Sequence, residues 1–171
     1  MPDFRGARTG ESLEERIGRL EDIESIKQLF HQYASYADNG YDAEGMGTLM
    51  TEDAIWESNS FGTYYGREEI KGFVSEVGKA ILFALHYMDN PTIEVASDGK
   101  TANGKWILLE PAIMTREESE ATDSVVITAD YDNDFVKVNG EWRIKHVRAN
   151  FRTVANLQDG WHEKRFRPDQ S

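Results

Sequence analysis

The order of the secondary-structure patterns is the feature that most constrains the fold, because helical patterns come first and β patterns later. In the first forty residues, apolar residues recur at steps of three and four, as on one face of an α-helix. Beyond Pro91 the chain is mostly β, with segments rich in β-branched and aromatic residues at 92–96, 105–114, 124–138 and 142–151. Helices followed by consecutive hairpins are typical of an α+β domain, whereas a parallel sheet would need alternating strands and helices.

The first helix is predicted to begin after Ser12, because Ser12 and Glu15 have the spacing of a capping box. Its apolar stripe, which we expect to face the core, starts with Ile17 and Leu20, and Asn39-Gly40 is predicted to end it. The elements expected next are a short helix at 42–50, a strand at 53–58, a turn and strand at 61–66 and a helix at 67–81.

Size and composition indicate one domain. With 171 residues and 39% apolar content, the chain can bury a core without covalent staples. Residues 1–11 are polar and contain glycine, which predicts a flexible N-terminal arm. We expect a single domain at 12–156 and a C-terminal tail at 157–171, whose segment GWHEKRF suggests subunit contacts.

Charge and missing motifs exclude several classes of protein. A net charge of −12 repels phosphate backbones, so no nucleic-acid partner is expected. The chain has no cysteine, which excludes disulfides and thiolate metal sites and suits a reducing compartment. No apolar run approaches the ~20 residues of a bilayer span, and no nucleotide-binding or nucleophile-elbow motif occurs. The sequence therefore predicts a cytoplasmic protein without membrane contact, metal or cofactor.

Two residues in the first half of the chain could carry chemistry. His86 lies in the apolar segment ILFALHYMDNP, an environment that lowers an imidazole pKa and keeps the ring neutral and basic. Asp38 falls in the last turn of the first helix, where the helix dipole disfavours an anion. One interpretation is that Asp38-Asn39-Gly40 is an ordinary helix-stop sequence. The other is that the function of the protein requires the Asp38 carboxylate at this unfavourable position.

The last strand carries two further candidates. Alternation puts Trp142, Ile144, His146 and Arg148 on one face of the strand. If Trp142 and Ile144 face the core, His146 and Arg148 face it too. The alternative is that this end of the strand leaves the core and both are solvated. Glu110 shares a face with apolar neighbours and would need a partner if buried, a role that Arg148 could fill.

Four fragments together carry a family resemblance. They are the helix that ends with Tyr33 and Asp38, and the segments at 52–70, 85–95 and 139–151. Over residues 15–155 this combination resembles the SnoaL-like branch of the NTF2-like superfamily. The fragments DAxW and GTYxG, which contain Trp56 and Tyr64, and the His before an Asn-containing strand resemble its hexachlorocyclohexane dehydrochlorinase family. The spacing of Tyr33, Asp38 and His86 also resembles the bile-acid 7α-dehydratase family and, more loosely, scytalone dehydratase.

The resemblance implies a cone, in which a curved antiparallel sheet wraps around N-terminal helices and encloses a deep apolar pocket. It makes His86 the general base and Asp38 the carboxylate that orients it, without a cofactor. Tyr33 and Arg148 become the groups that hold a substrate oxygen or leaving group. Glu110 lies near the position of an additional carboxylate of the dehydratases. The residues expected to contact substrate are Trp56, Tyr64, Glu110 and His146.

These expectations together predict a cofactor-independent lyase that removes a proton from a hydrophobic, ring-containing small molecule. Isomerase, polyketide cyclase and retro-aldol lyase activities in the same pocket remain open, as does a non-catalytic ligand-binding module, since a fold alone does not specify function. The aromatic-rich sheet suggests a homo-oligomer, and the resemblance favours a trimer over a dimer.

Overall fold

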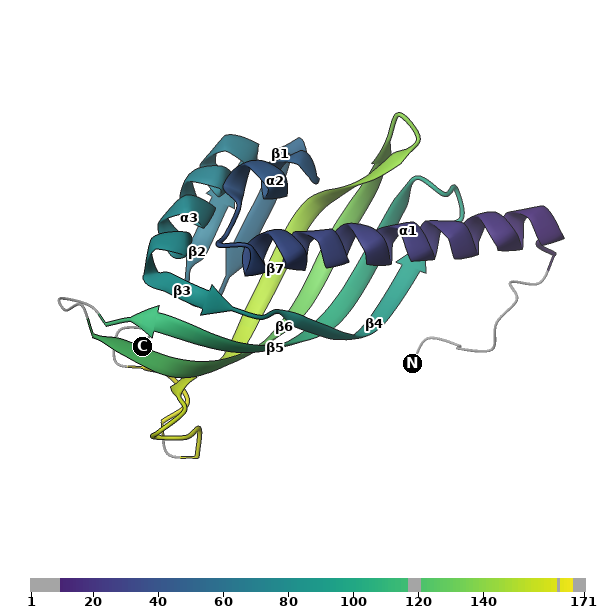
Figure 1. Ribbon diagram of the computed structural model, residues 1–171. Helices are drawn as coiled ribbons and strands as arrows, with labels where there is room; N and C mark the ends of the chain where they lie inside the picture. The colour runs from purple at the N-terminus through teal and green to yellow at the C-terminus, as the bar shows by residue number, and fades with distance from the viewer. Residues whose placement is uncertain (1–9, 117–120, 163, 168–171) are drawn as a thin grey trace.

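A computed structural model describes residues 10–116, 121–162 and 164–167 (Figure 1), so the predicted arm lies outside the described residues except for its last two. The elements are α1 (Leu13–Asp38), α2 (Ala43–Thr48), β1 (Met50–Ser58), β2 (Gly62–Tyr65), α3 (Arg67–Ala80), β3 (Ile81–Ala84), β4 (Tyr87–Val95), β5 (Thr101–Thr115), β6 (Thr122–Val138) and β7 (Glu141–Asn156). The predicted α+β order is confirmed. Among the described helices, none is long and apolar enough to cross a bilayer.

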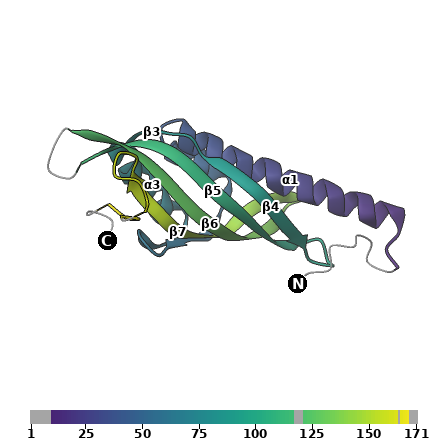
Figure 2. The ribbon, with the colours of Figure 1, turned by 90° about the horizontal axis from the view of Figure 1, so that it is seen from below.

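One curved, unclosed sheet forms the wall of the molecule. Within the described residues its strands follow the order β2-β1-β7-β6-β5-β3, and β4 also pairs with β5. Neighbouring strands are antiparallel except β1 and β7, which are parallel. The helices lie on the concave face (Figure 1), and the view from below shows the outer face of β4, β5 and β6 in front of them (Figure 2). This is the predicted cone.

α1 crosses the concave face and forms one wall of the interior. The predicted capping box is present, since Ser12 accepts from the N–H of Glu15 and the Glu15 side chain accepts from the N–H of Ser12. The expected core position of Ile17 and Leu20 is wrong: they are 47% and 61% exposed. Their part of α1 projects past the edge of the sheet, so the stripe becomes buried only from Ile26 onward (Figure 1).

A β-bulge in β7 changes which side chains face the interior. Ile144 of β7 pairs with Phe135 of β6. The neighbouring residue of β6, Asp134, pairs with His146, so Lys145 is an extra residue in β7. The buried positions therefore switch from Trp142 and Ile144 to Val147, Ala149 and Phe151. The predicted inward direction of His146 and Arg148 is wrong, because the bulge turns both to the outer face.

The described part of the C-terminal tail packs against its own chain. Phe166 forms a parallel bridge with Val154 near the end of β7, and the N–H of Arg167 donates to the carbonyl of Val154. The Arg167 side chain is buried and lies 3.5 Å from the carboxylate of Asp123. These contacts attach the tail to the end of β7, and the role of the tail in subunit contacts stays a prediction.

Candidate functional site

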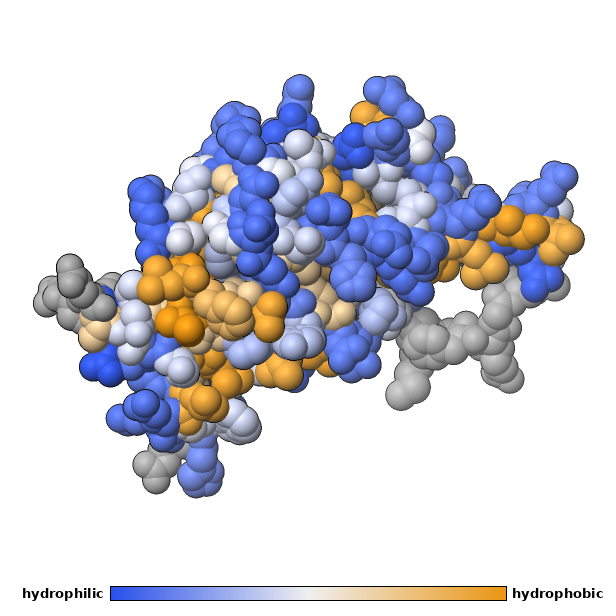
Figure 3. Space-filling view, viewed as in Figure 1, coloured by the Kyte–Doolittle hydropathy of each residue, from blue (hydrophilic) through white to orange (hydrophobic). Residues whose placement is uncertain are grey.

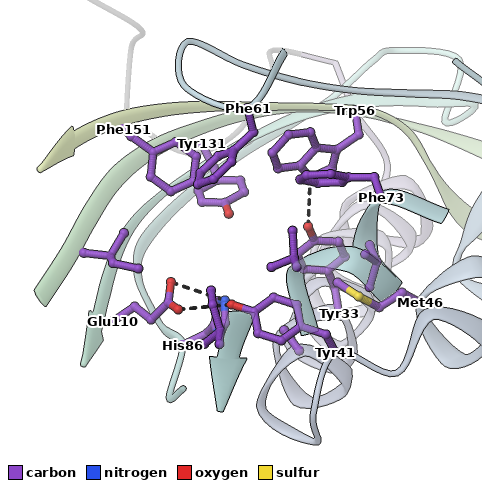
Figure 4. Close-up of a pocket in the computed structure, with 15 residues that line it drawn as sticks. Tyr33, Tyr41, Met46, Trp56, Phe61, Phe73, His86, Glu110, Tyr131 and Phe151 are labelled. Carbon is purple, nitrogen blue, oxygen red and sulfur yellow. Dashed lines mark hydrogen bonds and ion pairs between the residues drawn. The ribbon is translucent and has the colours of Figure 1, made fainter. Parts of the chain in front are cut away.

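The interior holds a pocket between the three described helices and the inner face of the sheet (Figure 4). The empty space between the lining atoms, counted to its open mouth and including solvent there, amounts to about 510 Å³. Aromatic and aliphatic side chains form most of its wall, and a few polar groups point into it. The residues that line it are Tyr33, Ala37, Tyr41, Met46, Trp56, Phe61, Phe73, Val74, Val77, Ile81, His86, Glu110, Ile127, Tyr131 and Phe151.

His86 and Asp38 are in direct contact although 48 residues separate them. Asp38 is the last residue of α1, and His86 lies in the two-residue link between β3 and β4. Asp38 Oδ1 accepts from the backbone N–H of His86 at 2.7 Å and lies 2.8 Å from Nδ1 of its ring. The ring is 5% exposed and the Asp38 side chain 29%. A carboxylate at Nδ1 places the proton there and leaves Nε2 to face the pocket.

Glu110 approaches the other side of the same ring. Its side chain is 3% exposed, and Oε2 lies 3.4 Å from Nε2 of His86. Its Oε1 accepts a hydrogen bond from the hydroxyl of Tyr41 at 3.2 Å. Figure 4 shows both contacts at the base of the pocket. Glu110 is buried on the inner face of β5 as the alternation predicted, but Arg148 is not its partner.

The two carboxylates change the proton affinity of the ring. Burial alone would lower the pKa of His86, but the negative charge of Glu110 and the hydrogen bond with Asp38 prevail and raise it above its ordinary value. Burial also raises the pKa of Glu110, and contacts with His86 and Tyr41 offset this only in part. Both shifts favour retention of a proton by the His86–Glu110 pair at pH values where a free imidazole loses it.

The three ionisable groups do not converge on a point, because Asp38 and Glu110 lie on opposite sides of the imidazole. Consistent with this, the described part of the chain contains no group of His, Asp and Glu side chains arranged to hold a metal ion. The arrangement is a chain of hydrogen-bonding groups, suited to moving a proton.

Tyr33 and Trp56 both line the pocket, and they are hydrogen-bonded to each other. The indole N–H of Trp56 donates to the hydroxyl oxygen of Tyr33 at 3.0 Å. Burial, chiefly, raises the pKa of Tyr33 to about 12, so its hydroxyl keeps its proton. Tyr64 lies behind the wall, where its ring stacks on Phe73 with ring centroids 4.1 Å apart and also contacts Trp56.

His146 and Arg148 lie on the outer face, away from the pocket. Arg148 donates to Asp134 at 2.7 Å and lies 2.8 Å from Nδ1 of His146. His146 Nε2 in turn lies 3.0 Å from a carboxylate oxygen of Glu57 on β1. These contacts tie the outer surfaces of β1, β6 and β7 together and leave both residues outside the candidate site.

Two tyrosines of the site were not singled out from the sequence. Tyr131 shares a face of β6 with Ile127 and Ala129, so alternation could have placed it inside. Tyr41 follows Gly40 in the link between α1 and α2 and has a positive φ of 56°. No local sequence pattern indicates that its hydroxyl reaches Glu110 on β5.

Fold and site together define an α+β cone that encloses an aromatic pocket with an imidazole between two carboxylates at its base. The model of the SnoaL-like domain family matches residues 18–148. The chain therefore belongs to the SnoaL-like family of the NTF2-like superfamily.

Solved structures with the same fold include two related to known enzymes. A type 2 hexachlorocyclohexane dehydrochlorinase, LinA, is 22% identical, with a TM-score of 0.73 over 82% of this chain and 92% of that one. A candidate scytalone dehydratase of Novosphingobium aromaticivorans is 20% identical, with a TM-score of 0.71 over 82% and 91%. An NTF2-like protein with a cystatin-like fold from the same organism is 24% identical, with a TM-score of 0.68 over 82% and 88%.

Proposed function

We propose that this protein is a cofactor-independent lyase that removes a proton from a hydrophobic, ring-containing small molecule and expels a leaving group. The observation that carries the proposal is the imidazole of His86, which is 5% exposed, anchored at Nδ1 by Asp38 and faced at Nε2 by Glu110. The aromatic wall of the pocket suits a ring. The names of two structural neighbours, a dehydrochlorinase and a candidate dehydratase, support the same reaction class.

In the proposed reaction, the His86–Glu110 pair is the base once it has lost its shared proton. A C–H bond of the substrate breaks and its proton goes to the pair. The electron pair forms a C=C bond, and the leaving group departs with its bonding electrons, as halide or, after taking up a proton, as water. Asp38 fixes the ring and stabilises the imidazolium, and positioned acid–base catalysis of this kind contributes about 100- to 10,000-fold.

An isomerase is the second candidate, because the pair that accepts a proton could return it to another carbon of the same substrate. Cyclase and retro-aldol activities would use the same base. A non-catalytic ligand-binding module would keep the pocket but would not need a titrating pair within it.

We further propose that the protein is a homo-oligomer, a trimer rather than a dimer, and that it works in the cytoplasm. Exposed apolar side chains on the outer face of β5, such as Leu109, support subunit contacts. The absence of cysteine suits a reducing compartment.

The proposal is tested by turnover of a panel of ring compounds that carry an acidic C–H next to a hydroxyl or halide leaving group. We expect wild type to turn over at least one of them and His86→Ala to be about 100- to 10,000-fold slower. Asp38→Asn should fall between the two, and Glu21→Gln, an exposed carboxylate on the same helix, should equal wild type. Equal rates in wild type, His86→Ala and Asp38→Asn would exclude this role.

A further inference from the structure

The two chain segments that carry the His86–Glu110 pair also carry exposed apolar side chains on the outer face. The wall of the pocket is a single sheet, so successive residues of a strand point alternately into the pocket and away from it. Glu110 points inward from β5, and its neighbour Leu109 is 49% exposed. His86 lines the pocket from the link between β3 and β4, and its neighbours Leu85 and Tyr87 are 37% and 56% exposed.

The position of the His86 ring depends on how firmly this link lies against β5. Leu85 and His86 lie between β3 and β4 and belong to neither strand. The backbone N–H of Leu85 donates to the carbonyl of Pro111 on β5 at 3.2 Å, and the N–H of His86 donates to Asp38 at 2.7 Å. If the link moved away from β5, the 3.4 Å contact between Nε2 of His86 and Glu110 would lengthen.

The exposed apolar side chains on this side form one surface across β3, β4 and β5, which Figure 2 shows in the view from below. Tyr87 lies directly opposite Leu109, and Phe83 lies directly opposite Ile113. Single exposed apolar residues are ordinary, but a contiguous group is typical of a contact with another protein surface. The members of this outer apolar surface are Phe83, Leu85, Tyr87, Ile107, Leu109 and Ile113.

The charge around this surface favours another copy of the chain as the partner. The chain carries a net charge of −12, so two copies repel each other in most orientations. Two ion pairs lie beside the outer apolar surface: Lys105 contacts Asp132 at 2.9 Å, and Arg152 contacts Asp130 at 2.5 Å. These carboxylates are balanced within their own chain, so a second copy meets less repulsion here, and a cationic partner finds little excess charge.

We propose that contact between copies of the chain through the outer apolar surface positions the His86–Glu110 pair, so that the site is complete only in the assembled protein. This inference rests on the proposed function and on the oligomer proposed with it, and it adds control of the site by assembly. A partner over Leu85, Tyr87 and Leu109 excludes water from the link and holds it against β5. In a separate chain these side chains stay in water, and the link opens more readily.

A looser link would change the proton affinity of the ring. The titratable groups that face His86 are Asp38 from α1, Tyr41 from the link between α1 and α2, and Glu110 from β5. The negative charge of Glu110 raises the pKa of His86, so a longer contact with Glu110 lowers this pKa.

The test measures assembly and site on the same samples of wild type, Leu109→Glu and Thr122→Glu. Light scattering gives the mass, NMR titration gives the pKa of the His86 ring, and amide hydrogen exchange gives the opening rate at the His86 N–H. Thr122→Glu is the matched control, because it adds the same charge at an exposed position at the start of β6. The N–H of Ile144, which is buried and donates to the carbonyl of Leu49, shows whether each variant is folded.

We expect Leu109→Glu to have the mass of one chain, a lower pKa of His86 than wild type, and about threefold to tenfold faster exchange of the His86 N–H. The added carboxylate can only raise the pKa of a nearby imidazole, so a decrease cannot come from the new charge. The Ile144 N–H should stay protected from exchange, and Thr122→Glu should equal wild type in every measurement.

A Leu109→Glu protein with the mass of one chain and wild-type values for His86 would overturn the inference. So would a variant that keeps the mass of wild type, or a wild type that is a single chain at every concentration. If Leu109→Glu fails to fold, dilution of wild type until it dissociates gives the same comparison without a substitution.

These outcomes are distinct from those of the turnover test. Altered His86 values in the single chain, with no turnover of any ring compound, would retain control by assembly and remove the lyase. Turnover that depends on His86 and is equal per chain in wild type and in single-chain Leu109→Glu would retain the lyase and remove control by assembly.

Discussion

His86 is held between two carboxylates, and each controls a different property of the ring. Asp38 accepts from both N–H groups of this residue, which fixes its orientation. Glu110 faces Nε2 from a position that is almost fully buried, so its charge acts with little screening by water. The ring is thus positioned from one side and its proton affinity is set mainly from the other.

We predict that Asp38→Asn and Glu110→Gln each lower the pKa of His86, because each removes an interaction that raises it. The decrease should be larger for Glu110→Gln, whose charge acts from a buried position. Titration of the His86 ring resonances by NMR measures it, with Glu21→Gln as the control. A pKa that stays the same in both variants would show that the contacts do not couple.

The same shift has a consequence for stability. The pKa of His86 is raised above its ordinary value of 6.5, so the folded protein binds the proton more tightly than the unfolded chain. The stabilisation is therefore complete below the unfolded pKa and is lost as pH rises through the folded one. The proposed lyase activity needs the deprotonated ring, so it should rise over the same pH range in which this stabilisation declines.

Residue types alone indicated part of this site. Both His86 and Asp38 were recognisable, one from its apolar surroundings and the other from its unfavourable helix end. Glu110 was recognisable as a buried carboxylate in need of a partner. Its actual partners, Tyr41 and His86, come from separate loops, and contacts between loops depend on how the whole sheet curves.

At the level of elements, the bulge in β7 decides which residues form the pocket. The sequence does contain its signal, because the apolar positions of β7 change from even numbers, Trp142 and Ile144, to odd numbers, Val147 and Ala149. Strict alternation missed this change. The helix boundaries were easier to predict, since capping box and Gly40 act within a few residues of the chain.

Asn133 stabilises the bulge. It is fully buried on β6, and its side-chain oxygen accepts from the backbone N–H of Arg148, beyond the extra residue of β7. Asn133→Ala would leave that N–H without a partner and should lower the free energy of unfolding by about 1–3 kcal/mol. Urea unfolding measures this, and Asn150→Ala, an exposed asparagine of β7, should stay within about 0.5 kcal/mol of wild type. Equal losses in both variants would contradict a specific role.

At the level of the whole molecule, the outer face of the sheet carries apolar side chains that a monomer would leave in water. Tyr87 and Leu109 are 56% and 49% exposed and lie directly opposite each other on β4 and β5. Phe83 and Ile113 form a similar exposed pair on β3 and β5. Apolar side chains also gather over β3 and at the projecting end of α1 (Figure 3). A surface of this kind is typical of subunit interfaces.

We predict that Leu109→Glu converts the proposed trimer to a monomer, because it would place a charge at the centre of this surface. Light scattering after size-exclusion chromatography should give about three times the chain mass for wild type and about one for the variant, as expected of a closed trimer. Thr122→Glu, an exposed position at the start of β6, is the control. A variant with the mass of wild type would rule out this surface as the interface.

The parallel pairing of β1 with β7 joins the beginning of the sheet to its end. During synthesis on the ribosome, β1 is made early, but its neighbour β7 is made only when the chain is nearly complete. Contacts of such long sequence separation slow folding and leave the apolar side chains of β1, such as Trp56, without part of their cover in the meantime. Chaperone demand during synthesis should therefore be highest for this strand, and a chain that stops before β7 would have no closed pocket.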